Sequence, residues 1–224
     1  MRSVDINVDV GEGFASDDAL LQIATSANVC CGAHAGSVEL CLETVAHCRS
    51  LGLRVGAHPG VADRANMGRA PIVFNGEEDR AALVRSLSEQ VAVTAWDYIK
   101  PHGALYNATA RIGPTTAPVV KVLVSLGLPL MGMPGTHHEE LAEAAGVAFI
   151  REGFADRAYL PEGLLVPRTS AGSVLNDHGQ IADQVLMLAE RVDSICVHGD
   201  SLGCVEIAAL VRRTLLDAGY EVGS

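Results

Sequence analysis

The chain has 224 residues with a formal net charge of −11, and 49% of them are apolar while only 4% are aromatic. This acidic balance excludes a typical nucleic-acid surface, which needs clustered Lys and Arg to neutralise phosphates. No run of about 18 apolar residues predicts a membrane span, and Asp5 and Asp9 interrupt any signal peptide. We therefore expect one domain, residues 1–224, that stays in the cytoplasm and binds neither nucleic acid nor membrane.

Short β-type runs alternate with helical runs along the chain. The expected strands are Val4–Val8, Ala27–Cys31, Leu53–Ala57, Asp97–Lys100, Leu128–Gly132, Val147–Arg151 and Ser194–Val197. The expected helices are Asp17–Ala24, Val38–Leu51, Glu77–Thr94, Thr115–Leu126, His137–Ala145, Gln180–Arg191 and Cys204–Ala218. Such alternation with short connections predicts a parallel sheet with right-handed crossovers. Periodicity alone leaves open whether the sheet closes into a barrel or remains doubly wound.

One long region, Phe154–Gly179, has no clear periodicity and is rich in Pro, Arg, Gly and Ser. A loop of this length inside a compact domain is usually functional. We therefore expect it to contribute to a binding or catalytic site.

Polar residues gather where the expected strands end. In chain order they are Asn7, Asp9 and Glu12, then His34, His58, Lys100 with His102, Glu152 with Asp156 and Arg157, and His198 with Asp200. Because the carboxyl ends of parallel strands share one face, we expect Asp9, His34, His58, His102 and His198 to face one cavity. The remaining histidines (His47, His137, His138 and His178) are expected to be solvated or capping groups. The pattern predicts an enzyme site.

These residue types support three chemistries. Asp9, His34 and His58 could bind a divalent metal that activates water. Asp9 or Glu12 could act as a general base with a histidine as the acid. Lys100 and Arg157 could hold an anionic substrate or a phosphate. Neither a P-loop nor a G-x-S-x-G elbow occurs in the sequence. From the residues alone, the prediction is an amide- or phosphate-processing enzyme with an anionic substrate.

The same clusters together resemble the LamB/YcsF family, the family of the A subunits of 5-oxoprolinases. The segments that carry the resemblance are Asp5–Gly13, Ser26–Gly36, Gly56–Gly60, Asp63-Arg64 with Gly68-Arg69, Lys100–Asn107, Glu152–Tyr159, Leu165–Arg168 and Cys196–Asp200. They run in the family's order from residue 5 to residue 200. The chain departs from the family's usual residues at Ala33, Ser37 and Met67.

The resemblance implies an irregular seven-stranded parallel β/α barrel, similar to the glycoside hydrolase/deacetylase fold. It also implies ATP-dependent cleavage of 5-oxo-L-proline to L-glutamate, in which ATP, bound with Mg²⁺, is the co-substrate. The implied partners are 5-oxoprolinase subunits B and C. The implied catalytic residues are Asp9, Glu12, His34, His58, Lys100 and His102. The implied substrate- or phosphate-binding residues are Asn7, Asn28, Tyr106, Asn107, Asp156, Arg157, Arg168, His198 and Asp200.

Two rival hypotheses remain at this point. The first is a stand-alone metal-dependent deacetylase or polysaccharide hydrolase, which requires a tightly bound divalent ion on the free chain. The second is a non-catalytic scaffold within a complex. Lys100 separates the oxoprolinase hypothesis from the hydrolase hypothesis, because a metal-dependent deacetylase acting on a neutral sugar has no need of its charge. We expect Lys100 to project at the mouth of the fold, so that Lys100→Met abolishes ATP-coupled ring opening with thermal stability nearly unchanged.

Overall fold

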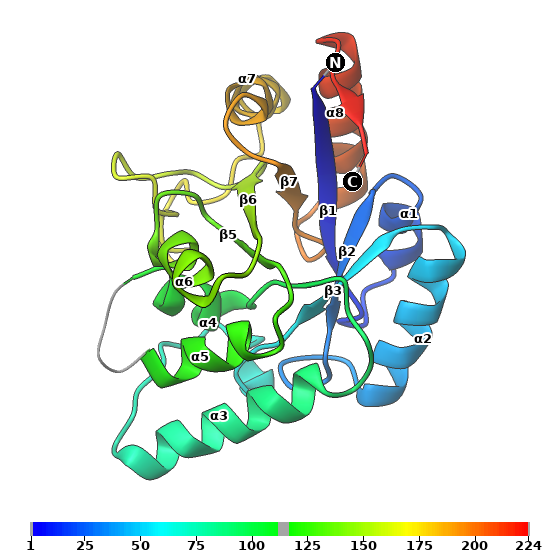
Figure 1. Cartoon of the computed structure of the whole chain (residues 1–224). Coiled ribbons are helices and arrows are strands. Elements are labelled where there is room, and N and C mark those ends of the chain that lie inside the picture. Colours follow the sequence, from blue (N-terminus) through cyan, green and yellow to red (C-terminus); the bar gives the residue numbers. More distant parts are fainter. Residues whose placement is uncertain (1, 112–116, 224) are drawn as a thin grey trace.

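The computed structural model describes residues 2–111 and 117–223, and it shows a closed barrel of seven parallel strands (Figure 1). The strands are β1 (Ser3–Val10), β2 (Ser26–Cys30), β3 (Arg54–His58), β4 (Tyr98–Ile99), β5 (Leu130–Gly132), β6 (Phe149–Phe154) and β7 (Ser194–Val197). Each strand pairs with the next, and β7 returns to pair with β1. The predicted barrel is confirmed, and the open sheet is excluded.

Eight α-helices connect and surround these strands in the part of the chain that is described (Figure 1). They are α1 (Asp17–Leu21), α2 (Val38–Ser50), α3 (Glu77–Val91), α4 (Gly103–Thr109), α5 (Ala117–Ser125), α6 (His137–Ala145), α7 (His178–Ala189) and α8 (Cys204–Asp217), with the short 3₁₀ helix η1 (Arg64–Asn66). The predicted helices are confirmed to within a few residues at their ends, while residues 115 and 116 of one prediction lie outside the described residues. No helix in these described ranges is both long and apolar enough to span a membrane.

Three short elements were not predicted: η1, α4 and a last strand, β8 (Glu221–Val222). β8 pairs with the first residues of β1, where Ser3 lies opposite Glu221. Elements as short as these carry little periodicity of their own, because they are stabilised mainly by tertiary contacts.

The alternation along β1 explains why the interior of the barrel is polar. Val4, Ile6 and Val8 belong to the hydrophobic core between the barrel and its helices. Successive side chains point to opposite faces of a strand, so Asp5 and Asn7 point into the barrel. There Asp5 accepts hydrogen bonds from two serine hydroxyls, and Asn7 bonds the amide of another strand. This polar column leads directly to the carboxyl ends of the strands.

β6 extends further than predicted, and its extension matters for the site. The strand was expected to end at Arg151, but it continues to Phe154, so Glu152 lies inside the barrel wall. The long region that follows is largely irregular, as predicted, and short bridges join Arg157 to Val174 and Tyr159 to Leu165. These bridges fold the segment back on itself beside the barrel mouth.

The prediction for His138 was wrong. Its ring is completely buried and lies 2.8 Å from the hydroxyl of Thr109, beside Gly132. A Cβ at Gly132 would come within 2.5 Å of the ring, so the glycine makes room for it. Burial lowers the pKa of His138 to about 3, and the ring is therefore neutral.

Candidate active site

A cavity of about 510 Å³ opens at the carboxyl ends of the strands. Asp9, His58, His102 and His198 line it, as predicted. The rest of its wall includes Arg69, Lys100, Tyr106, Asn107, Phe154, Arg157, Leu165 and Arg168. His34 also follows its strand, β2, but it is completely buried behind the ring of His102 and does not line the cavity. The prediction of one shared mouth is thus confirmed for four of the five residues.

Lys100 lines this cavity as part of its floor, and its side chain is buried there and does not project at the mouth as expected. Its Nζ lies 2.8 Å from Oδ1 of Asp9 and 2.7 Å from Oε1 of Glu152. It also donates to Oδ1 of Asn7 at 3.2 Å and approaches Sγ of Cys196 at 3.1 Å. The ammonium is therefore held at one point inside the barrel by groups from three strands, β1, β6 and β7.

The charges of this cluster stabilise one another. Burial alone would raise the pKa of Asp9, but the ammonium of Lys100 and then His58 hold it well below its ordinary value. Burial likewise opposes the charge on Lys100, yet Asp9 above all raises the pKa of Lys100 well above its ordinary value. Burial raises the pKa of Cys196, so its thiol stays protonated. The site therefore contains a permanent buried ion pair.

Three histidine rings lie together on one side of the cavity. His34 and His102 stack with their ring centres 3.7 Å apart, and His58 meets both edge-on. The stack needs glycine at positions 60 and 68, because a Cβ at Gly60 would come within 2.5 Å of Nδ1 of His34. Burial lowers the pKa of His34 and of His102. Burial thus favours the neutral imidazole of His34 and of His102.

Each of these rings has one nitrogen with a defined partner. Nδ1 of His58 lies 2.8 Å from the carbonyl oxygen of Lys100, and Nε2 of His102 lies 2.7 Å from that of Met67. A carbonyl oxygen only accepts, so both of these nitrogens carry the proton. Nε2 of His34 lies 3.2 Å from Oε1 of Glu12 and donates to that carboxylate.

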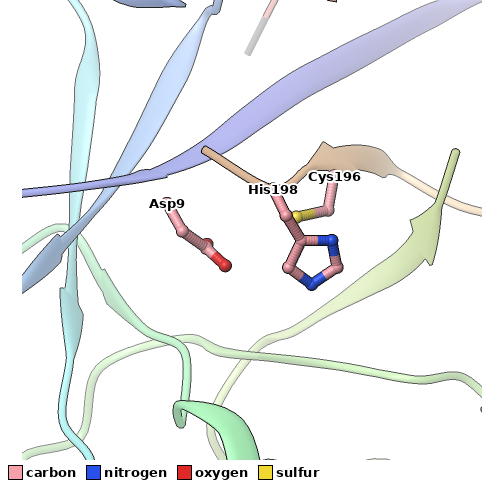
Figure 2. Close-up of side chains that lie close together, drawn as sticks. All are labelled: Asp9, Cys196 and His198. Atoms are coloured by element: carbon pink, nitrogen blue, oxygen red, sulfur yellow. The ribbon is translucent and has the colours of Figure 1, made fainter. Parts of the chain in front are cut away.

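A separate histidine, His198, is oriented by a carboxylate. Its Nδ1 donates to Oδ1 of Asp156 at 2.9 Å, and the second oxygen of Asp156 accepts from Ser201 at 2.9 Å. Figure 2 shows His198 projecting beside Cys196 from the end of β7 and facing Asp9 of β1. With Nδ1 protonated, Nε2 of His198 is free to accept a proton at the cavity.

Arginines stand around the mouth. Asp200 pairs with Arg69 at 2.8 Å and with Arg168 at 3.2 Å, and these guanidiniums remain about a quarter exposed. Arg157 is more buried, and it donates to the carbonyl oxygens of Ser173 and Val166 in the long irregular segment. Arg69 and Arg168 are therefore placed to meet an anion, while Arg157 mainly holds the segment in place.

The remaining predicted residues divide between the floor and the wall. Asn28 lies inside the barrel, where its amide donates to Asn7 and to Asp9 at 2.7 and 2.8 Å. Tyr106 lines the cavity and its buried hydroxyl has no hydrogen-bond partner among the described residues, so it can bond a ligand. Asn107 also lines the cavity and bonds the carbonyl of Gly103.

Two residues with clear roles in this arrangement, Glu152 and Arg69, were absent from the predicted set. Glu152 lies within a segment that carried the family resemblance, but the strand was expected to end before it. Arg69 follows η1 in an irregular loop, where no periodicity indicates direction. Glu152 was also one of the polar residues that follow the sixth expected strand, although no role was assigned to it. For Arg69, only its position in the motif could have pointed to a role.

Two groups of residues in the described part of the chain could hold a metal ion. One is Glu12, His58 and His102, and the other is Asp9, Cys196 and His198. The predicted set of Asp9, His34 and His58 is not one of them, because Nε2 of His34 faces the Glu12 carboxylate.

Comparison with known proteins gives a consistent result. Residues 4–224 match the model of the LamB/YcsF family. The A subunit of the 5-oxoprolinase from Neisseria meningitidis serogroup C (strain 053442) is 37% identical, with all of both chains covered. A crystal structure of a lactam utilization protein from Thermus thermophilus is 32% identical over 99% of both chains, with a TM-score of 0.84.

More distant structures share the fold alone. A family 4 carbohydrate esterase from Streptomyces lividans, solved in complex with acetate, has a TM-score of 0.52 and 10% identity, with all of this chain and 92% of the esterase covered. This likeness shows that the barrel architecture is shared with deacetylase-type enzymes, and it transfers no residue role.

Proposed function

Because this chain belongs to the LamB/YcsF family, we propose that it is the A subunit of an ATP-dependent 5-oxoprolinase, which cleaves 5-oxo-L-proline to L-glutamate. ATP with Mg²⁺ is the co-substrate in this proposal, and subunits B and C are the partners. The names of two similar proteins, the A subunit of a 5-oxoprolinase and a lactam utilization protein, support it. The observation that carries it in this chain is a cavity with a fixed ammonium at its floor and paired arginines at its mouth.

The cavity suits a small anionic lactam. The substrate has a carboxylate, and Arg69 and Arg168 offer planar guanidiniums in the wall where such a group can be held. Tyr106 offers a buried hydroxyl to the ring amide, whose oxygen accepts hydrogen bonds. Phe154 and Leu165 supply apolar wall for the methylene groups of the ring. A few convergent polar groups on an apolar wall are typical of small-molecule sites.

The chemistry requires a poor amide carbonyl to become electrophilic. Phosphorylation of the lactam oxygen by ATP would achieve this, with release of ADP. Water would then add to the ring carbon, and the C–N bond would break with a proton passing to the ring nitrogen. A second water would release phosphate from the acyl phosphate so formed, which leaves L-glutamate. In this chain, His198 would take the proton of the attacking water through Nε2, while Asp156 holds the ring in the required tautomer. The ammonium of Lys100 would stabilise negative charge that develops on the oxygens. Asp9 keeps this ammonium in position.

The direct test measures L-glutamate and ADP release from 5-oxo-L-proline and ATP, using this chain with and without subunits B and C. Glutamate should form only with ATP and the complete set of subunits. Lack of glutamate in the complete mixture, with every component folded, would refute the proposal. If glutamate formation is unchanged by substitution of cavity residues, the scaffold hypothesis is favoured instead.

A stand-alone deacetylase or polysaccharide hydrolase is the second candidate, favoured by the barrel fold and the histidine cluster. It predicts acetate or sugar release from an acetylated oligosaccharide by this chain alone, without ATP. The two candidates therefore differ in substrate, in partner requirement and in ATP dependence.

A further inference from the structure

The unexplained feature of the histidine cluster is the contact between His58 and His102. Nε2 of His58 lies 3.0 Å from Nδ1 of His102, and both side chains are almost fully buried. The opposite nitrogen of each ring already donates to a backbone carbonyl, of Lys100 and of Met67. With neutral rings, two lone pairs face each other at hydrogen-bond distance, so a proton or a cation must lie between them.

The surroundings favour a cation. Oε1 of Glu12 lies 3.6 Å from Nδ1 of His102, and Oδ2 of Asp9 lies 3.5 Å from Nε2 of His58. Metal–ligand bonds of about 2.1 Å at 90–110° place neighbouring donor atoms about 3.0–3.5 Å apart. The separations of 3.0 Å between the two histidine nitrogens and 3.6 Å between His102 and Glu12 are close to these values. One buried ammonium, that of Lys100, lies near these carboxylates. It already forms ion pairs with Asp9 and Glu152.

We propose that Glu12, His58 and His102 bind a divalent transition metal ion, with the Asp9 carboxylate beside His58 as a nearby negative charge. Two imidazoles and a carboxylate select Zn²⁺, Co²⁺, Fe²⁺ or Mn²⁺ over Mg²⁺, which prefers oxygen ligands. The site also has the outer contacts that such centres use, because backbone carbonyls fix both ligand tautomers and His34 donates to the Glu12 carboxylate.

The ion would be accessible to a ligand. Asp9, His58 and His102 line the cavity, so an open coordination position would face it. Catalytic metal sites keep such a position open for water or for a substrate oxygen. This inference goes beyond the proposed function, because a metal ion here is compatible with lactam cleavage and with deacetylation alike. A bound metal alone therefore no longer separates those two enzyme classes.

The test uses the isolated chain and Co²⁺ as the probe. Metal-free protein is titrated with Co²⁺, and bound metal is measured by elemental analysis after gel filtration and by visible absorption. One Co²⁺ per chain should bind, with absorption bands in the visible range that indicate nitrogen ligands. Glu12→Gln keeps the shape of the side chain but should weaken binding at least about a hundredfold, since loss of an outer contact alone costs about 10–100-fold. His102→Ala should abolish binding.

His198→Ala is the matched control, because His198 belongs to the other candidate group and lines the same cavity. It should keep the stoichiometry and the spectrum. Loss of Co²⁺ in His198→Ala with retention in Glu12→Gln would overturn the assignment. Absence of Co²⁺ and Zn²⁺ binding to the wild-type chain would also overturn it and favour a shared proton. Circular dichroism checks that each variant is folded. If His102→Ala does not fold, the isosteric variant Glu12→Gln still decides the test. Glutamate formation is measured separately, so the proposed function can fail independently.

Discussion

Nζ of Lys100 lies 2.8 Å from Oδ1 of Asp9, although the two residues are 91 positions apart in the chain. β1 supplies the carboxylate, and Lys100 follows β4 on the other side of the barrel. Barrel closure brings the two side chains together. Because both are buried, their ion pair affects the stability of the fold as well as the chemistry of the site. This revises the expected behaviour of a Lys100 variant.

Lys100→Met should abolish ATP-coupled ring opening and also destabilise the fold. Removing one partner of a buried ion pair leaves an uncompensated charge, at a cost of about 3–5 kcal/mol. Urea unfolding of the isolated chain measures the free energy, and glutamate release in the complete complex measures activity. The double variant Lys100→Met/Asp9→Asn should regain part of the lost stability but no activity. Arg151→Gln, which breaks an exposed pair with Glu139, is the control and should change stability by less than about 1 kcal/mol. Full activity of Lys100→Met would remove the ammonium from the proposed mechanism.

Asp9→Asn should reduce turnover in the assembled complex at least about a hundredfold, the usual scale for loss of a group that stabilises developing negative charge, because the Lys100 ammonium is no longer held in position. The substitution keeps the shape but removes the charge that holds Lys100 and faces His58. Steady-state kinetics at saturating 5-oxo-L-proline and ATP measure the effect. Unchanged turnover would shift the essential carboxylate role to Glu12 or Asp200.

Acid should unfold the wild-type chain more steeply than Asp9→Asn. The pKa of Asp9 is lowered in the folded state, so between this value and the unfolded value of about 3.9 the unfolded chain binds more protons. The contribution of Asp9 is therefore complete above about pH 4–5 and is lost as pH falls through the folded pKa. Urea unfolding between about pH 5 and 2 should show a smaller pH dependence in the variant. Equal slopes would mean that Asp9 titrates alike in both states.

Asp156→Asn should reduce turnover by about 10²–10⁴-fold, because the amide no longer enforces the tautomer in which Nε2 of His198 accepts a proton. His198→Ala should have a similar effect, and the double variant should be no slower than His198→Ala, because the two residues act as a unit. Ser201→Ala removes only the other hydrogen bond to Asp156 and should have a small effect. Additive losses would show that the two residues act separately.

Arg168→Gln should raise KM for 5-oxo-L-proline about 10–100-fold with a smaller change in kcat, since a charge-assisted hydrogen bond contributes about 1.5–3 kcal/mol. Arg168 lines the cavity and pairs with Asp200 at its mouth. Initial rates at varied 5-oxo-L-proline and saturating ATP separate the two constants. An unchanged KM would show that the substrate carboxylate binds elsewhere.

The sequence by itself determined the alternating strands and helices, and it placed the polar residues at strand ends. Apolar periodicity reports which face of a local element is buried, so β7 and α6 were predicted with their observed bounds. Strand direction in a parallel sheet then sufficed to predict that Asp9, His58, His102 and His198 share one mouth.

Only the tertiary structure decided how these side chains pair. Barrel closure buries Lys100 between Asp9 and Glu152, and it places His58 against His102 while His34 is turned to Glu12. Such contacts join residues that are 22 to 91 positions apart in the chain, and they depend on side-chain direction and on close approach at Gly60 and Gly68. Local periodicity carries no information about either, because it records burial and not the identity of the partner.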